Sequence, residues 1–114
     1  MADGVSVSGD GWWAEAGREY PGSVVGGSLL DHGTRLVLAL GMGRHQYRVD
    51  LRSDGGEHFA GTWALDNGLT GAAGGALYRS LDGYFFFGRW AEGGREYHWW
   101  FCLRTGEAYV DEDD

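Results

Sequence analysis

Histidine and cysteine, two residue types that often catalyse reactions or bind metal ions, are few in this chain of 114 residues. They are four histidines and one cysteine: His32, His45, His58, His98 and Cys102. No two histidines stand at a short spacing, such as HxH or HxxxH, that would place both imidazoles on one metal ion. His98 and Cys102 share a strand face but lie about 13 Å apart along an extended strand. We therefore expect no metal site and no nucleophile–base pair, and we expect Cys102 to be a small buried apolar residue.

Other catalytic patterns are also missing from the sequence. The serines lack the Gly-x-Ser-x-Gly context of a hydrolase nucleophile. The glycine-rich stretch 71–75 lacks the Lys-Ser or Lys-Thr ending of a phosphate-binding loop. Four glutamates each have an arginine close by, which favours ion pairs near turns over acid–base pairs; they are Glu15, Glu19, Glu92 and Glu96. We therefore predict no catalytic residue, no cofactor and no enzymatic activity.

Charge and composition restrict the classes of partner. The net charge is −8 at pH 7, and all nine cationic side chains are arginines. Nucleic-acid binding needs clustered cations, so we expect no nucleic-acid partner. The apolar runs are too short for a membrane span, and the opening MADGVSVSGDG is too polar for a secretory leader. We expect a cytoplasmic protein without membrane contact, made of one β domain over residues 1–110 and an acidic tail over 111–114.

A ten-residue phrase occurs twice in the chain. Residues 11–20 read GWWAEAGREY and residues 88–97 read GRWAEGGREY. Internal similarity of this kind exposes the building unit of a fold. Each copy places a tryptophan opposite a tyrosine and a glutamate opposite an arginine around a glycine-containing turn, and such cross-strand pairs stabilise hairpins. The pairs are Trp13 with Tyr20, Glu15 with Arg18, Trp90 with Tyr97 and Glu92 with Arg95.

Alternating apolar residues and frequent turn signals predict an all-β fold. The predicted strands are 11–16, 18–30, 34–41, 44–52, 57–65, 70–80, 83–91 and 95–104, with short additional pieces at 4–8 and 107–110. Asn67-Gly68 is the strongest type I′ hairpin signal, and Gly93-Gly94 is nearly as strong. Serial hairpins of this length favour a small antiparallel up-and-down barrel of about eight strands. A two-sheet sandwich is the alternative.

The hairpin at 83–104 carries aromatic side chains on both faces. One face is predicted to be core and contains Phe86, Trp90, Tyr97, Trp99 and Phe101. The other face contains Phe85, Phe87, Arg89, His98, Trp100 and Cys102. This second face either packs under a neighbouring segment or forms a binding surface, because large exposed apolar patches mark interaction sites.

Three short motifs resemble those of the avidin and lipocalin barrels: Gly61-Thr62-Trp63, Gly88-Arg89-Trp90 and the run from Trp100 to Gly106. Those families use Gly-x-Trp strands, and avidins end one strand in a Trp-x-Leu run before Ser/Thr-Gly. The similarity covers about residues 60–107. The lipocalin motif belongs to the first strand, whereas the copies here are central and late, and the polar residues that grip biotin in avidins have no match. The resemblance implies an eight-stranded barrel whose mouth or lumen binds a ligand, without naming that ligand.

The sequence leads to two functional hypotheses. The first is a non-catalytic protein that holds a small flat or apolar ligand through aromatic side chains of the barrel, with Arg89 or Glu96 orienting the polar end of the ligand. The alternative is a protein-interaction module of the inhibitor, immunity or anti-defence type, acting through an exposed aromatic face. Self-association into a homo-oligomer is compatible with either. The candidate contact residues are Phe85, Phe87, Arg89, His98, Trp100, Trp63 and Trp90.

Overall fold

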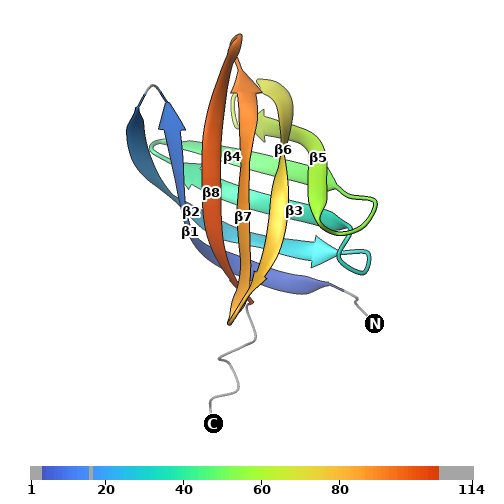
Figure 1. The fold of residues 1–114 in the computed structure, drawn as a ribbon. Helices are drawn as coiled ribbons and strands as arrows, with labels where there is room; N and C mark the ends of the chain where they lie inside the picture. Colours follow the sequence, from blue (N-terminus) through green and yellow to red (C-terminus); the bar gives the residue numbers. More distant parts are fainter. Residues whose placement is uncertain (1–3, 16, 106–114) are drawn as a thin grey trace.

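The protein forms a closed barrel of eight antiparallel strands in a computed structural model that describes residues 4–15 and 17–105. The strands are β1 (Val5–Glu15), β2 (Arg18–Leu30), β3 (Arg35–Met42), β4 (His45–Arg52), β5 (His58–Leu65), β6 (Thr70–Ser80), β7 (Gly83–Glu92) and β8 (Arg95–Thr105). Each strand pairs with the next along the chain, and β1 pairs with β8 to close the sheet (Figure 1). The predicted up-and-down barrel is therefore confirmed, and the sandwich alternative is not.

The predicted strand boundaries agree with the structure to within two residues, apart from the start of β1. The piece expected separately at 4–8 belongs to β1, which runs without a break from Val5 and changes its register against β2 between Val7 and Gly9. The piece expected at 107–110 and the acidic tail lie outside the described residues. In residues 4–15 and 17–105, no helix is long and apolar enough to cross a membrane.

Two hairpin turns differ in a way that the sequence did not predict. Gly93 and Gly94 have positive φ angles of 63° and 81°, as a two-residue type I′ turn requires. At the other site only Gly68 has a positive φ, of 97°. There the backbone N–H of Gly68 donates to the carbonyl of Leu65, and Asn67 Oδ1 accepts a hydrogen bond from the Leu69 N–H. The type I′ prediction at Asn67-Gly68 is wrong because the asparagine side chain stabilises a longer loop.

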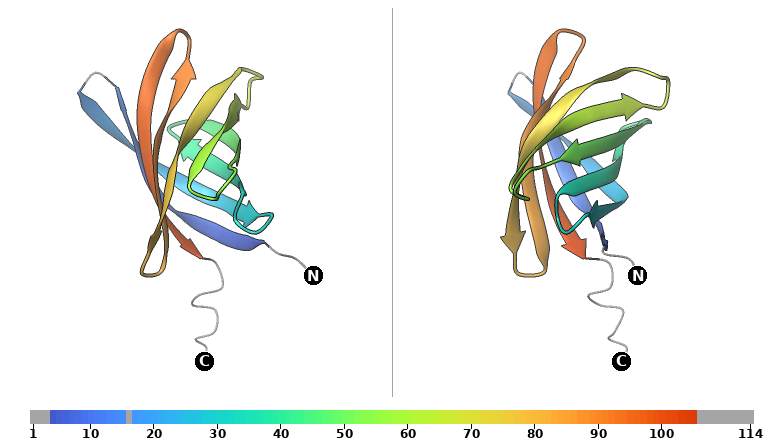
Figure 2. Two further views of the ribbon diagram at one scale, coloured as in Figure 1. Left: turned by 45° about the vertical axis from the view of Figure 1, so that its right-hand side comes forward. Right: turned by 90° about the vertical axis from the view of Figure 1, so that its right-hand side faces the viewer.

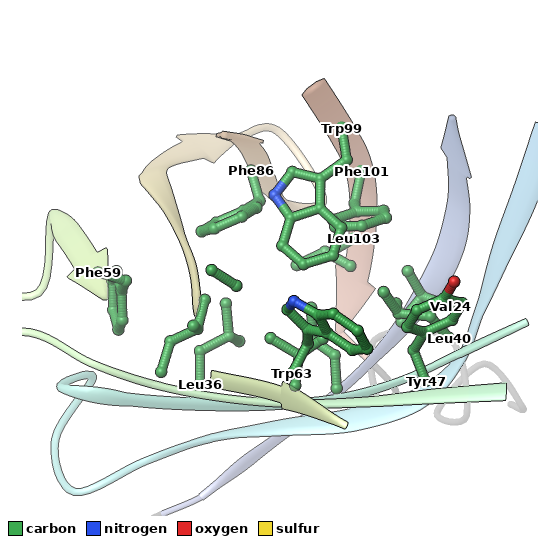
Figure 3. Close-up of a cluster of buried hydrophobic side chains, with 14 of the residues drawn as sticks. Val24, Leu36, Leu40, Tyr47, Phe59, Trp63, Phe86, Trp99, Phe101 and Leu103 are labelled. Atoms are coloured by element: carbon green, nitrogen blue, oxygen red, sulfur yellow. The ribbon is translucent and has the colours of Figure 1, made fainter. Parts of the chain in front are cut away.

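The core lies inside the barrel and consists of the inward-facing apolar side chains of the strands. Trp63, Trp99, Phe86 and Phe101 are all at most 1% exposed. Figure 3 shows these rings, with leucine and valine side chains from other strands, converging on the barrel interior. The predicted core face of 83–104 is confirmed, with Tyr97 only partly buried at its margin. Interior packing of this kind supplies the main stabilisation of a small barrel.

Both repeated Trp–Tyr pairs adopt the predicted geometry. Trp13 stacks on Tyr20 with ring centroids 4.4 Å apart, and Trp90 stacks on Tyr97 at 4.7 Å. The β7–β8 register is also the predicted one, with Gly88 opposite Trp99. On its other side Gly88 faces Gly75 of β6, where the two strands approach closely. A Cβ atom added to Gly88 would lie 1.9 Å from the carbonyl oxygen of Gly74.

We expect Gly88→Ala to lower the free energy of unfolding by up to about 3 kcal/mol, because β6 and β7 must separate to admit one methyl group. Gly26→Ala is the matched control, since a Cβ there meets no atom within 4 Å. The control should leave the free energy unchanged or raise it by up to about 1 kcal/mol. Urea unfolding of both variants measures the difference. Equal stability of the two variants would contradict the close approach of β6 and β7.

Candidate functional site

The seven predicted contact residues separate into two groups in the barrel. The outward-facing group lies on β7 and β8 and comprises Phe85, Phe87, Arg89, His98 and Trp100. Trp63 and Trp90 face inward and are 1% and 3% exposed. Successive side chains of a strand point to opposite sides, so the two groups are separated by the thickness of the sheet. The first group forms an external surface, whereas the two tryptophans belong to the core.

An apolar row crosses five strands on the outside of the barrel. Ala76, Phe87, Trp100, Trp12 and Pro21 are successive register partners on β6, β7, β8, β1 and β2. We call Phe87, Trp100 and Trp12 the outer aromatic row. Phe87 is 49% exposed, and its ring centroid lies 6.3 Å from that of Trp100. The second aromatic face of the hairpin is thus a surface of the molecule.

Sequence reasoning missed Trp12 as a member of this surface. A signal was present, because adjacent residues of one strand must point to opposite faces. Trp13 corresponds to Trp90 in the repeat, and Trp90 was assigned to the core. In the structure Trp13 packs edge-on against Trp90 and Tyr97. Trp12 is consequently directed outward, opposite Trp100.

A groove of about 540 Å³ lies beside this row, over β5 to β8. Its floor is the outward side of β6, where Ala72, Gly74 and Ala76 carry at most a methyl group. Phe87 and Arg89 of β7 stand next to this floor, opposite Ala76 and Gly74 respectively. The hollow therefore results from small residues on one strand next to large residues on its neighbour. Volumes of about 300–1,000 Å³ are usual for sites that take small molecules.

Polar groups surround the groove on two sides. Arg89 forms an ion pair with Glu96 of β8, with 3.5 Å between the charged atoms. His98 of β8 and His58 of β5 also line it. Both members of the ion pair are more than half exposed, so their mutual attraction is weak and either group is available to a ligand. The groove thus combines an aromatic wall with groups that donate and accept hydrogen bonds.

Glu92 does not act as the predicted partner of Arg95, although the two residues are opposite in register. Its carboxylate accepts hydrogen bonds from the Tyr47 hydroxyl at 3.3 Å and from Trp90 Nε1 at 3.2 Å. Arg95 instead contacts Glu15 of the first hairpin, which joins the tips of β1–β2 and β7–β8. The repeat predicted pairs within each hairpin, but the closed barrel brings the two copies together and allows pairing between them.

Burial, together with the nearby carboxylate of Glu92 and its hydrogen bond, raises the pKa of Tyr47 to about 12. The neutral phenol is the form that fits the interior, because a buried phenolate beside a carboxylate is disfavoured. This hydrogen-bonded group closes one end of the core. At the same end, the indole Nε1 of Trp63 donates a hydrogen bond to the Ala91 carbonyl at 2.8 Å.

The opposite end of the barrel has a wider hollow of about 670 Å³. Leu29 and Leu77 form its apolar base, and Glu57, Arg79 and Tyr84 stand around it. The guanidinium carbon of Arg79 lies 5.7 Å from the centroid of the Tyr84 ring. This is the mouth that the resemblance to lipocalins and avidins implied. The lumen beneath it is occupied by core side chains (Figure 3).

Cys102 is exposed, so its prediction as a buried residue is wrong. Phe101 and Leu103 on either side point into the core, which leaves the position between them facing outward with Trp100.

Within residues 4–15 and 17–105, no group of three or more histidine, cysteine or acidic side chains is arranged to hold a metal ion. His45 lies 4.0 Å from Asp66 at the rim of the barrel and is more than half exposed.

Comparisons of the chain with models of protein families, with curated proteins and with solved structures found no match. The observed eight-stranded antiparallel barrel is compatible with a calycin-like barrel, the architecture that the sequence motifs resembled. The fold and the outer groove therefore carry the functional argument by themselves.

We expect Trp100→Ala to lower the free energy of unfolding by only about 1 kcal/mol, because it removes a surface cross-strand contact. Trp99→Ala is the matched comparison one residue away, and it should cost about 3–5 kcal/mol because that indole is fully buried. Urea denaturation followed by circular dichroism measures both. If the two substitutions cost the same, the outer aromatic row is part of the core.

Tyr47→Phe should change the response of stability to alkaline pH. The folded state holds the Tyr47 proton more tightly than the unfolded state, whose tyrosines titrate near pH 10, so this group favours folding fully below about pH 10. Its contribution declines by up to about 1.4 kcal/mol per unit as the pH rises from 10 to 12. The phenylalanine variant should be less stable than the parent at neutral pH, and this deficit should shrink above pH 10. A constant deficit from pH 8 to pH 12 would contradict the raised pKa.

Proposed function

We propose that the protein is a non-catalytic binding protein that holds a small, flat, mainly apolar ligand in the groove over β5–β8. The observation that carries this proposal is the groove itself, a hollow of about 540 Å³ that joins an aromatic wall to a charged pair. A planar molecule can lie on the Ala72, Gly74 and Ala76 floor with one edge against Phe87. Its polar end then faces Arg89, Glu96 and the two histidines.

The filled interior of the barrel supports a site on its outside. Aromatic and leucine side chains fill the interior, in contrast to the lumen site that a lipocalin-type or avidin-type protein would use. The mouth is a weaker candidate, because Tyr84 is the one tyrosine, phenylalanine or tryptophan among its described lining residues and already faces the Arg79 guanidinium. The outer groove, by contrast, includes Phe87, Arg89 and His98 from the predicted contact residues.

A second candidate function is a protein-interaction module of the inhibitor, immunity or anti-defence type. It is supported by the continuation of the apolar row beyond the groove to Trp100, Trp12 and Pro21. Tryptophan is enriched among the residues that dominate protein interfaces. The barrel is closed by the β1–β8 pairing, so a partner cannot add a strand to a free edge and must dock through such side chains.

Native mass spectrometry of gently purified protein tests both candidates, with Ala72→Phe as the decisive variant. Ala72 is exposed on the groove floor, so a phenyl ring there fills the hollow without entering the core. The parent should carry a small added mass that Ala72→Phe loses at least tenfold in occupancy. Ala64→Phe is the control, because Ala64 is exposed on the outer side of β5 away from the groove lining. It should retain the added mass.

The other outcomes separate the alternatives. A co-purified polypeptide that is lost on Trp100→Ala supports the interaction module in place of the small-ligand site. A small mass that persists in Ala72→Phe places the ligand elsewhere and overturns the groove proposal. Bare protein in every sample also counts against the groove proposal.

A further inference from the structure

Three arginines lie on β4 and on the turn that precedes it. Strand β4 is on the other side of the barrel from β7 and β8 (Figure 2). We call Arg44, Arg48 and Arg52 the arginine stripe. Arg44 precedes β4 in its turn, and the other two follow at intervals of four residues. All three are exposed. Residues four apart on an extended strand face the same side, so Arg48 and Arg52 both point outward from β4, and Arg44 stands at the turn where this strand begins.

The stripe is free of ion pairs within residues 4–15 and 17–105. Arg48 has Ala39 and Ala64 as its register partners on the two neighbouring strands. These methyl groups neither shield nor neutralise it. The nearest acid on the strand, Asp50, is held by a bidentate contact from Arg35, with distances of 3.0 Å and 2.7 Å.

That Arg35–Asp50 pair shows what a carboxylate does on this surface. The hydrogen bond from Arg35 lowers the pKa of Asp50, and the same contact raises the pKa of Arg35. Arginine presents a planar fork that matches the two oxygens of a carboxylate. One carboxylate of the barrel is thus already bound in this manner. The charge of Arg52 also acts on Asp50 and helps to lower its pKa, whereas Arg44 and Arg48 form no ion pair within residues 4–15 and 17–105.

The net charge of −8 is a sum over the whole chain and does not reveal this local cationic surface. Six of the 17 acidic residues lie outside the described residues, and they are Asp3, Glu107, Asp111, Glu112, Asp113 and Asp114. All nine arginines lie within the described residues. The described barrel is therefore close to neutral as a whole, and the stripe is a local excess of positive charge that attracts anionic partners.

The spacing of the stripe restricts the anion that fits it. The Cα atoms of Arg48 and Arg52 are about 13 Å apart along β4, because each residue of a strand advances about 3.3 Å. A carboxylate directly over Arg48 is therefore not also directly over Arg52. An extended peptide has the same rise per residue as β4, so acidic side chains at every fourth position keep in step with the three arginines.

We propose that the arginine stripe docks an extended acidic peptide segment of a partner protein, which runs along β4 and places carboxylates on Arg44, Arg48 and Arg52. Nucleic acid fits less well. Single strands need aromatic platforms for their bases, and the register partners of Arg48, Asp50 and Arg52 on β3 and β5 are alanine, valine, threonine and Arg35, none of which is aromatic. Duplex DNA needs more phosphate contacts than three arginines supply. The inference is independent of the groove on the opposite face.

Fluorescence anisotropy with two labelled nonapeptides of equal composition tests the spacing directly. The spaced peptide is Glu-Ser-Thr-Ser-Glu-Ser-Thr-Ser-Glu, and its isomer Glu-Glu-Glu-Ser-Thr-Ser-Ser-Thr-Ser groups the three glutamates together. At low ionic strength the full chain should bind the spaced peptide about tenfold more tightly, since each exposed ion pair contributes a factor of about two to five. Equal affinity for the two isomers would overturn the proposal.

Variants assign the binding to the stripe. Arg48→Gln should weaken the spaced peptide about two- to fivefold, and the triple variant R44Q/R48Q/R52Q should weaken it at least tenfold. Arg18→Gln removes the same charge at an exposed position on the first hairpin and should have no more than a slight effect. Equal losses for Arg18→Gln and Arg48→Gln would indicate general charge attraction and refute docking on β4. If a duplex DNA oligonucleotide binds more tightly than the spaced peptide and this binding depends on the stripe, the partner is nucleic acid and the peptide proposal is wrong. Circular dichroism of each variant confirms the fold.

Discussion

The close contact of β6 with β7 is the constraint on which both sides of the barrel wall depend. Gly75 faces Gly88 across these strands, and neither position could take a Cβ without a clash. On the inside, the missing side chains leave room for the rings of Phe86 and Trp99. On the outside, the neighbouring small residues of β6 form the floor of the groove. One run of small residues thus allows the aromatic core to pack and shapes the surface that we propose as a binding site.

Barrel closure determines where the remaining aromatic side chains go. In an open sheet, the second aromatic face of 83–104 could have been covered by another layer. Here the sheet closes on itself through β1 and β8, so every outward side chain stays on the surface unless a partner covers it. The same closure removes the free edges that would invite strand addition. Recognition then depends on side chains alone, which makes their identity on each strand the determinant of what binds.

The sequence predicted the local pairings and missed the contacts that depend on closure. Turn chemistry and the repeat were sufficient for the register of β7 with β8, because hairpin pairs are set by residues close in the chain. The contacts of Arg95 with Glu15 and of Glu92 with Tyr47 join strands that are far apart in the sequence. The groove likewise needs β6 beside β7 with a known register before small and large residues can be compared. Cys102 was misjudged from its apolar neighbours, although its strand parity already placed it outside.

Charge illustrates the same difference between composition and arrangement. A net charge of −8 argued against a nucleic-acid partner, yet residues i and i+4 of an extended strand lie on the same side and can gather charge of one sign there. On β4 this line is cationic, while the aromatic surface lies across the barrel on β7, β8 and β1. Two surfaces of different chemistry on different strands of the barrel exterior can be occupied at the same time without competing. The proposed ligand in the groove and the proposed acidic segment on β4 are therefore compatible, because they contact different strands.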